Sequence, residues 1–267
     1  MPASRRRSGR VSPALWIPAG LALGLLALPL VALAVRAPWS RLGELLARQE
    51  VVQALGLSLG TAALATLVSL ILGIPLAVVL ARSGDWPAVP RRLLRAVVTV
   101  PLVLPPVVGG VALLLLLGRR GLLGEHLPFS IPFTTAAVVI AQAFVAMPFL
   151  VLAVEGALRA SDPRFEQAAA TLGASRFTVF RRVTVPLVAP GIAAGALLCF
   201  TRSLGEFGAT ITFAGSFPGV TQTLPVATYL ELQRDPDAAI ALSLILMLVS
   251  VAVLVSLRDR WTGGLRG

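Results

Sequence analysis

Hydrophobic residues dominate this chain in six long stretches that short polar segments separate. A helix needs about 20 mostly apolar residues to cross a bilayer, and each of the six is long enough: 14–35, 53–81, 96–118, 133–158, 187–215 and 238–257. No Ser/Gly-rich linker or low-complexity tract divides them. The pattern therefore predicts an all-α integral membrane protein in which six transmembrane helices form a single domain over residues 1–267.

Composition supports this class. The chain has 57% hydrophobic residues, 13% charged residues and a mean hydropathy of +0.88, whereas soluble domains have about 25% charged residues. The first stretch could instead be a cleaved signal peptide, with a basic start and Ala32-Leu33-Ala34 as a weak cleavage site. Its apolar core exceeds the roughly 7–15 residues of a signal sequence, which favours a first spanning helix.

Arginine predicts the orientation. If the N-terminus is cytoplasmic, the inner segments hold 16 arginines and the outer loops 6, with Arg202 inside a span. Because cytoplasmic loops carry the excess of positive charge, both termini and the polar segment 159–186 are expected in the cytoplasm. The net charge of +11 then reflects topology and contact with anionic membrane lipid, and gives no reason to expect nucleic acid as a partner.

A polar, arginine-rich insert interrupts the hydrophobic pattern after the fourth stretch. Asp162 and the proline that follows predict a helix start, and Gly173 predicts its end, since glycine adopts positive φ without steric cost. Ser175 predicts the N-cap of a second short helix, which Pro186 and Pro190 are expected to end. Two short helices at an angle, with the small residues Ala168 to Ala170 letting another backbone come close, would form a surface onto which a soluble partner docks.

The insert resembles the EAA loop of binding-protein-dependent ABC importer permeases. Gly173 and Pro186 have the thirteen-residue spacing of that motif. Gln167 occupies the position of the motif's glutamate, and Glu166 lies one residue earlier, so the resemblance does not require a charge there. In the family this loop is the coupling helix that sits in a cleft of a cytoplasmic ATPase. The residues that this assigns to an ATPase-coupling loop are Glu166, Gln167, Ala168, Ala169, Gly173, Arg176 and Pro186. An ordinary amphipathic cytoplasmic loop is the alternative.

Two charges fall within the fifth stretch. Charged residues at membrane depth usually face a bundle interior or an aqueous cavity. Arg202 and Glu206 have i, i+4 spacing, so they can share a helix face and neutralise each other. They could brace the bundle or gate a pathway. Gly205 and Gly208 flank the glutamate, and small residues let helices approach closely.

The third stretch contains consecutive prolines. Pro105 and Pro106 lack backbone N–H groups and should kink or break a helix, which lipid tolerates only where protein or water satisfies the freed carbonyls. Gly109 and Gly110 follow, and without side chains they make this face of the helix thinner. We expect this face along a translocation path; a tight helix crossing of small residues is the alternative.

Three sequence blocks are similar to molybdate (ModB-type) ABC permeases and, more loosely, to sulfate permeases. They are residues 101–110, 203–210 and 213–229. The resemblance implies the MetI-like architecture, an inner-membrane location and import of an oxyanion, with molybdate expected and sulfate or tungstate left open. It also implies a second copy of the permease, two cytoplasmic P-loop ATPase subunits and an extracytoplasmic oxyanion-binding protein.

Missing residues restrict the chemistry of the chain. All 23 basic residues are arginine, so a P-loop lysine cannot exist here, and ATP and Mg²⁺ are expected on the partner ATPase with no cofactor on this chain. A single His126 and a single Cys199 make no metal cluster. We expect no enzyme activity. A proton-driven secondary transporter with Glu155 and Glu206 as proton carriers is the alternative from another class, followed by a membrane-embedded enzyme or assembly factor.

Overall fold

The computed structural model describes residues 15–263, and for residues 254 and 256–263 it describes only the backbone. This part of the chain consists of helices joined by loops and turns, and it contains no strand. Five helical segments within it are long and apolar enough to cross a membrane, and a bent helix pair makes a sixth span if it is counted as one. The long helices are α1 Trp16–Val35, α3 Gln49–Arg82, α6 Thr135–Ala160, α9 Val185–Leu204 and α12 Pro236–Gly263.

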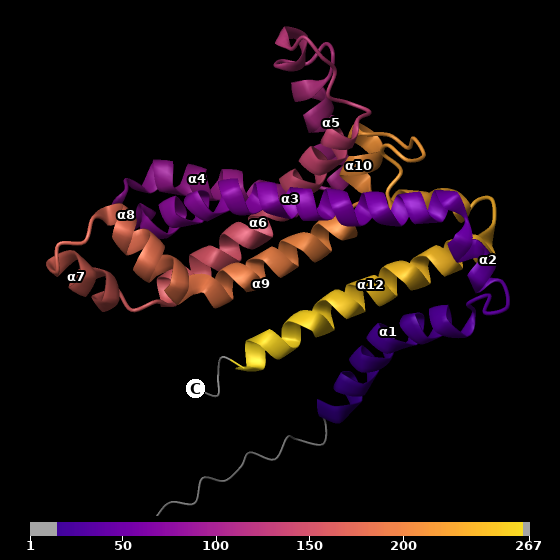
Figure 1. Cartoon of the computed structure of the whole chain (residues 1–267), viewed down its shortest axis with the longest axis horizontal. Coiled ribbons are helices and arrows are strands. Elements are labelled where there is room, and N and C mark those ends of the chain that lie inside the picture. Colours follow the sequence, from indigo (N-terminus) through magenta and orange to yellow (C-terminus); the bar gives the residue numbers. More distant parts are fainter. Residues whose placement is uncertain (1–14, 264–267) are drawn as a thin grey trace, which may run out of the picture.

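Shorter elements connect these helices. The bent pair is α4 Ala88–Val103 and α5 Pro106–Leu117, and the remaining α-helices are α2 Leu42–Ala47, α7 Arg164–Thr171, α8 Arg176–Val179, α10 Gly208–Phe213 and α11 Leu224–Glu231. Two 3₁₀ turns, Ser83–Asp85 and Gly124–His126, and the π-helical turn η4 Phe180–Thr184 complete the order. In Figure 1, α3, α6, α9 and α12 run along the long axis, with α7 and α8 at one end and α2 at the other.

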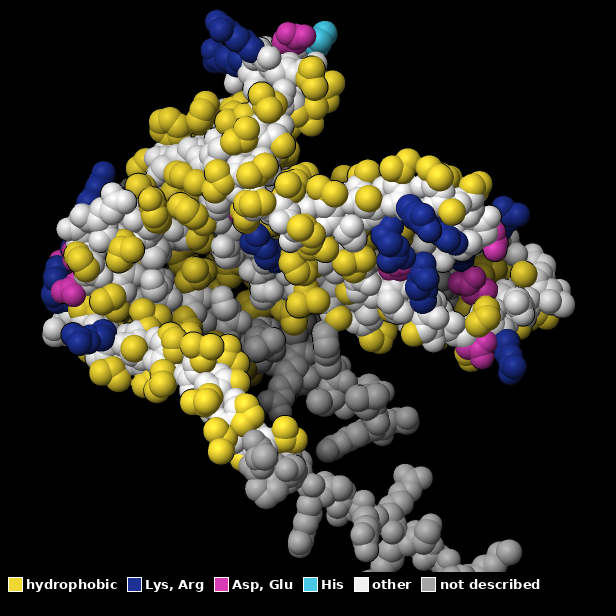
Figure 2. Space-filling view, turned by 180° about the vertical axis from the view of Figure 1, so that it is seen from behind, with side chains coloured by type: hydrophobic (Ala, Val, Ile, Leu, Met, Phe, Trp, Pro, Cys, Tyr) yellow, Lys and Arg dark blue, Asp and Glu magenta, His cyan; other side chains and the backbone are white. Residues whose placement is uncertain are grey.

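Helix α6 forms the centre of the bundle, between α3 and α9. Leu150 and Val154 of α6 are fully buried against Leu80 of α3 and Cys199 of α9. Small residues allow the close approach: a Cβ on Gly195 would lie 3.0 Å from the Leu150 side chain. The outer faces of the bundle remain apolar, as the hydrophobic side chains in Figure 2 show, which is the arrangement that lipid requires.

Helix α1 has no buried residue and packs little against the rest of the described chain. It is attached through α2, where Leu45 is 2% exposed and packs on Ala238 and Ala241. Arg41 reinforces this contact through ion pairs with Asp237 at 3.1 Å and Asp235 at 3.8 Å. The predicted start of this span at residue 14 lies outside the described residues.

The third span is not the continuous helix that the hydrophobic stretch 96–118 suggested. Its first half begins at Ala88, and the chain bends by 118° between α4 and α5. Leu104, at the bend, has the extended ψ of 134° that is favoured before a proline, and Pro106 starts the new helix. The expected break at the two prolines is therefore present, whereas the predicted start of the span at residue 96 was wrong, because the helix before the bend begins at Ala88.

The fifth span also differs from the expectation. Pro186 and Pro190 do not end the second short helix: a continuous helical segment runs from Arg176 through η4 to Leu204. Pro186 sits in the first turn of α9, directly after the π-helical turn, and the segment continues past it. At the other end the predicted span 187–215 was too long, because the helix stops at Gly205 and α10 is a separate element.

Candidate functional site

The segment α7–α8 forms a helical hairpin whose ends follow the sequence signals. Asp162 Oδ1 accepts a hydrogen bond from the Arg164 N–H at 2.9 Å, at the start of α7. Gly173 closes it with a φ of +83°, and the Ala174 N–H donates back to the Ala169 carbonyl at 3.1 Å, as in a Schellman motif. Ser175 caps α8 by accepting from the Thr178 N–H at 3.2 Å. Both expected helix starts and the expected stop are confirmed.

Helix α7 lies at one end of the bundle, beyond the spanning helices, and has no buried residue (Figure 1). Three large apolar side chains of the hairpin are exposed: Phe165 by 58%, Leu172 by 89% and Phe177 by 70%. They lie outside the long helices of the bundle, and exposed large apolar groups beside polar ones commonly mark an interaction surface. Gln167 and Ala168 are also exposed on α7. The hairpin therefore has the exposure and chemistry of a docking surface.

Glu166 points back toward the bundle instead of toward a partner. Its carboxylate forms an ion pair with Arg82 at the end of α3 at 3.1 Å, and it accepts a hydrogen bond from the Thr184 hydroxyl of η4 at 2.6 Å. An open cleft of about 320 Å³ lies beside it, lined by Gln167, Ala170 and Arg176 among others. One side chain thus connects the α7–α8 hairpin to two spanning segments. No local sequence signal predicts this link, because Arg82 lies 84 positions away.

Arg202 and Glu206 form the expected ion pair, with a 2.6 Å separation. The pair does not lie along one helix, because α9 ends at Leu204 and Glu206 follows the break. Glu206 is 1% exposed, and its other carboxylate oxygen accepts from the Ala209 N–H at 2.9 Å. The glutamate therefore joins the end of α9 to the start of α10.

The glycines of α5 and α10 meet in one crossing. A Cβ on Gly110 would lie 2.7 Å from the Thr212 side chain and 2.9 Å from the Ala209 carbonyl, and one on Gly208 would lie 2.9 Å from Pro106. Gly109 packs against Phe144, 3.0 Å from such an atom. Helix α5 thus rests on α10 and α6 at these positions. Pro105 and Pro106 are exposed at the bend, and a pathway role for these residues stays a prediction.

A family described as binding-protein-dependent transport system inner membrane components matches residues 73–263. This range contains the α7–α8 hairpin, the bent helix pair and the Arg202–Glu206 pair. The chain belongs to this family. It is therefore an inner-membrane permease component, and its helices have the MetI-like arrangement: a structure of the MetNI methionine ABC transporter in inward-facing conformations superposes with a TM-score of 0.64, 17% identity and coverage of 79% of this chain and 94% of that one.

Two relatives align with most of the permease. The molybdenum transport system permease protein ModB of Mycobacterium tuberculosis is 50% identical over 248 residues, 92% of this chain and 93% of its own length. The sulfate transport system permease protein CysT of Escherichia coli is 34% identical over 240 residues, 87% of this chain and 86% of its own length.

Glu155 of the permease is a buried carboxylate at the end of α6, near the α7 end of the molecule. Its side chain is 5% exposed and forms ion pairs with Arg95 at 2.5 Å and Arg159 at 2.8 Å. Both glutamates suggested as proton carriers are therefore bound to arginine. In the described part of the permease no group of three or more His, Cys, Asp or Glu side chains could hold a metal ion.

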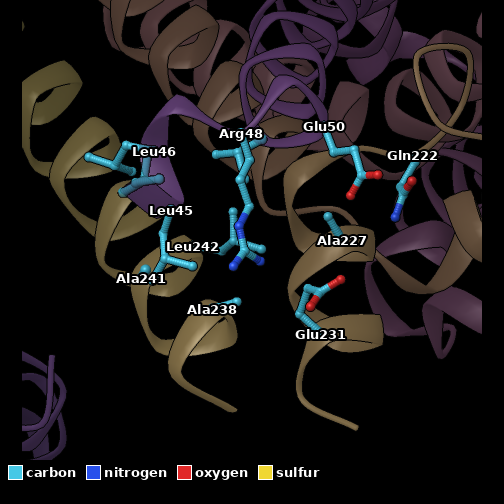
Figure 3. Close-up of a pocket in the computed structure, with 12 residues that line it drawn as sticks. Leu45, Leu46, Arg48, Glu50, Gln222, Ala227, Glu231, Ala238, Ala241 and Leu242 are labelled. Carbon is cyan, nitrogen blue, oxygen red and sulfur yellow. The ribbon is translucent and has the colours of Figure 1, made fainter. Parts of the chain in front are cut away.

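A small cavity lies at the opposite end of the permease, between α2, α3, α11 and α12 (Figure 3). Its volume of about 30 Å³ suffices for one or two water molecules. Glu50 and Glu231 contribute carboxylates to its lining, while Arg48 is already paired with Asp235 at 3.8 Å. Because of its size and its acidic groups, this cavity is unsuited to an oxyanion. The sequence pattern did not predict it, since its lining comes from two segments, 45–51 and 222–245, that lie far apart in the chain.

Proposed function

We propose that this permease is the transmembrane subunit of an ATP-driven ABC importer for a tetrahedral oxyanion, and that the oxyanion is molybdate. The observation that carries the proposal is the 50% identity, over 92% of the chain, to a permease named for molybdenum transport. The block 203–210 supports it further, because the residues that resemble molybdate permeases include the buried Glu206, which joins α9 to α10.

The α7–α8 hairpin is the proposed contact with the ATPase. An energy source on another chain is required, because this one has no lysine for a P-loop. The arginine excess on the same side as the hairpin supports a cytoplasmic position. Gln167, Ala168, Ala169 and Arg176 would contact the ATPase directly, and Gly173 and Pro186 would fix the shape of the segment.

Glu166 is the proposed transmission point. When two ATPase subunits close on ATP, their motion moves α7, and the Arg82–Glu166–Thr184 contacts carry that displacement into α3 and α9. Two permease copies would thereby alternate between inward-open and outward-open states. The pathway would run near the bent pair α4–α5 and the α10 segment, where Pro105, Pro106, Gly109, Gly110 and Gly208 lie.

An extracytoplasmic binding protein would deliver the oxyanion to the end of the bundle that carries α2. Selection would occur mostly on that protein, since the cavity at this end holds only one or two waters and is lined by carboxylates. ATP and Mg²⁺ would bind the ATPase and not this chain.

The cargo is tested by uptake into proteoliposomes that contain the permease, its ATPase and its binding protein. Radiolabelled molybdate should accumulate with ATP, tungstate should compete, and sulfate in equal excess should have little effect. The 34% identity to a sulfate permease makes sulfate the specific alternative. Competition by sulfate as strong as that by unlabelled molybdate would reassign the cargo.

A proton-coupled secondary transporter remains the alternative from a different class. It requires a carboxylate that exchanges protons with both sides of the membrane. Glu155 and Glu206 are each held in an ion pair with an arginine, so neither carboxylate is free for that role. A pH gradient without ATP should therefore drive no molybdate uptake into the same vesicles.

A further inference from the structure

A cleft lined by arginines lies at the α7 end of the molecule, outside the docking hairpin. Its volume is about 280 Å³, and it opens between the start of α4 and the end of α6. Its lining consists of Gly84, Arg91, Arg92, Arg95 and Arg159. Figure 2 shows dark-blue side chains gathered at this end of the bundle, beside a ridge of hydrophobic ones.

The cleft carries an excess of positive charge. Arg95 and Arg159 share the single buried carboxylate of Glu155. Arg91 donates to the Gly84 carbonyl at 2.9 Å, a neutral group, and Arg92 has no ion pair among the described side chains. Four guanidinium groups against one carboxylate leave a net charge of +3, so the cleft suits an anion with several acceptor oxygens.

Helix α4 places an apolar surface next to this charge. Val89, Leu93 and Val97 are 67%, 61% and 71% exposed, and they share the outward face of the helix. Trp86, just before α4, is 44% exposed, and tryptophan is enriched where membrane meets water. Arg92, also exposed, lies between the apolar face and the arginine face in helical rotation. A ligand bound here would contact guanidinium groups and hydrocarbon-facing side chains together.

We propose that this cleft binds the phosphate group of an anionic phospholipid, whose acyl chains lie along the apolar face of α4. Arginine suits the task, because its planar guanidinium pairs with phosphate oxygens through two parallel hydrogen bonds. A free oxyanion would offer the same acceptor oxygens, but it would leave the apolar face unused. This inference rests on the membrane location of the chain and requires neither the proposed cargo nor the proposed coupling.

The test measures lipid binding by the purified permease in phosphatidylcholine nanodiscs that contain a small fraction of fluorescent phosphatidylglycerol. The variant Arg91→Gln/Arg92→Gln leaves both partners of Glu155 in place, so the buried carboxylate stays neutralised. An arginine near an anionic surface contributes about a fivefold change in affinity, so the double variant should bind phosphatidylglycerol about 25-fold more weakly. The control Arg119→Gln/Arg120→Gln removes two adjacent exposed arginines elsewhere and should bind like the unmodified permease.

A second arm separates the two sources of the anion. Inorganic phosphate or molybdate at millimolar concentration should displace little of the bound lipid, because neither can use the apolar face. The proposal is overturned if the cleft variant binds phosphatidylglycerol as tightly as the control, or if the soluble anions displace the lipid completely. Thermal unfolding in pure phosphatidylcholine is expected to be the same for both variants, which would show that the loss of lipid binding by the cleft variant does not come from misfolding.

Discussion

Gly173 forms the turn of the α7–α8 hairpin. Its φ of +83° turns the chain between α7 and α8, and the space around its Cα is open, with no atom within 4 Å of an added Cβ. A substitution there is therefore opposed only by the backbone conformation. A β-branched residue tolerates this conformation worst.

Replacing Gly173 by valine should uncouple ATP hydrolysis from uptake. The left-handed conformation costs an L-residue about 1–2 kcal/mol, so the turn relaxes and α7 loses its position, while the spanning helices stay folded. The readout is molybdate taken up per ATP hydrolysed in proteoliposomes with the partner subunits. Gly60→Val is the matched control, because that site is also open but lies within a regular helix. Normal coupled uptake by the Gly173 variant would count against the assignment of the hairpin.

The Arg202–Glu206 pair can be tested as a brace or a gate with a double-mutant cycle. Glu206→Gln keeps the acceptor for the Ala209 N–H but leaves Arg202 without its counter-charge, which should destabilise the protein by about 3 kcal/mol. Adding Arg202→Met removes the unpaired charge and should restore most of the thermal stability. A brace also predicts recovered uptake in the double variant. A stable double variant without uptake would instead assign the pair to gating.

At the scale of elements, neighbouring residues predict the helix ends correctly, whereas contacts between distant segments do not show in the sequence pattern. The start at Asp162, the stop at Gly173 and the cap at Ser175 depend on neighbouring residues alone, so the sequence predicts them. Pro186 does not end the helix as predicted. No local signal shows that a π-helical turn precedes it and runs directly into α9. The Glu166–Arg82 contact could not be predicted, because it joins segments that only folding brings together.

Glu166 provides the element-scale prediction. Glu166→Gln removes the ion pair with Arg82, although an amide oxygen can still accept from Thr184, so the hairpin should keep its fold and transmit motion less well. Exposed or half-exposed pairs contribute at most about 1 kcal/mol to stability, so thermal unfolding should hardly change. ATP hydrolysis should become less dependent on the cargo-loaded binding protein.

The control for this variant is Glu44→Gln, which removes an exposed carboxylate paired with Arg48 at 3.6 Å at the other end of the molecule. If hydrolysis by the Glu166 variant responds to the binding protein as the control does, α7 does not act through this contact.

At the scale of the whole molecule, the number and length of the hydrophobic stretches determine most of the architecture. The class, the spanning segments and the polar hairpin all follow from where apolar stretches begin and end. The 118° bend of the third span and the separation of α10 from α9 do not follow in the same way, because both depend on how α5, α6 and α10 pack at Gly110 and Gly208. The hydrophobic sequence of α1 likewise does not predict that this helix packs sparsely and has no buried residue.

The proposed orientation predicts the accessibility of each end of the bundle. A cysteine at Leu172, which is 89% exposed on the hairpin, should react with a membrane-impermeant maleimide only after the cells are opened. A cysteine at Glu125, in the loop after α5, should react in intact cells. Cys199 is fully buried, so the unmodified chain should give a low background. Labelling of Leu172→Cys in intact cells would reverse the topology.

The central claim is that this permease moves its cargo only when a separate ATPase acts on it through the α7–α8 hairpin. The most direct measurement is molybdate uptake into proteoliposomes that contain the permease alone or together with the ATPase and the binding protein, each with and without ATP. Uptake is predicted only in the complete system with ATP. Uptake by the permease alone, with or without an imposed pH gradient, would contradict the account.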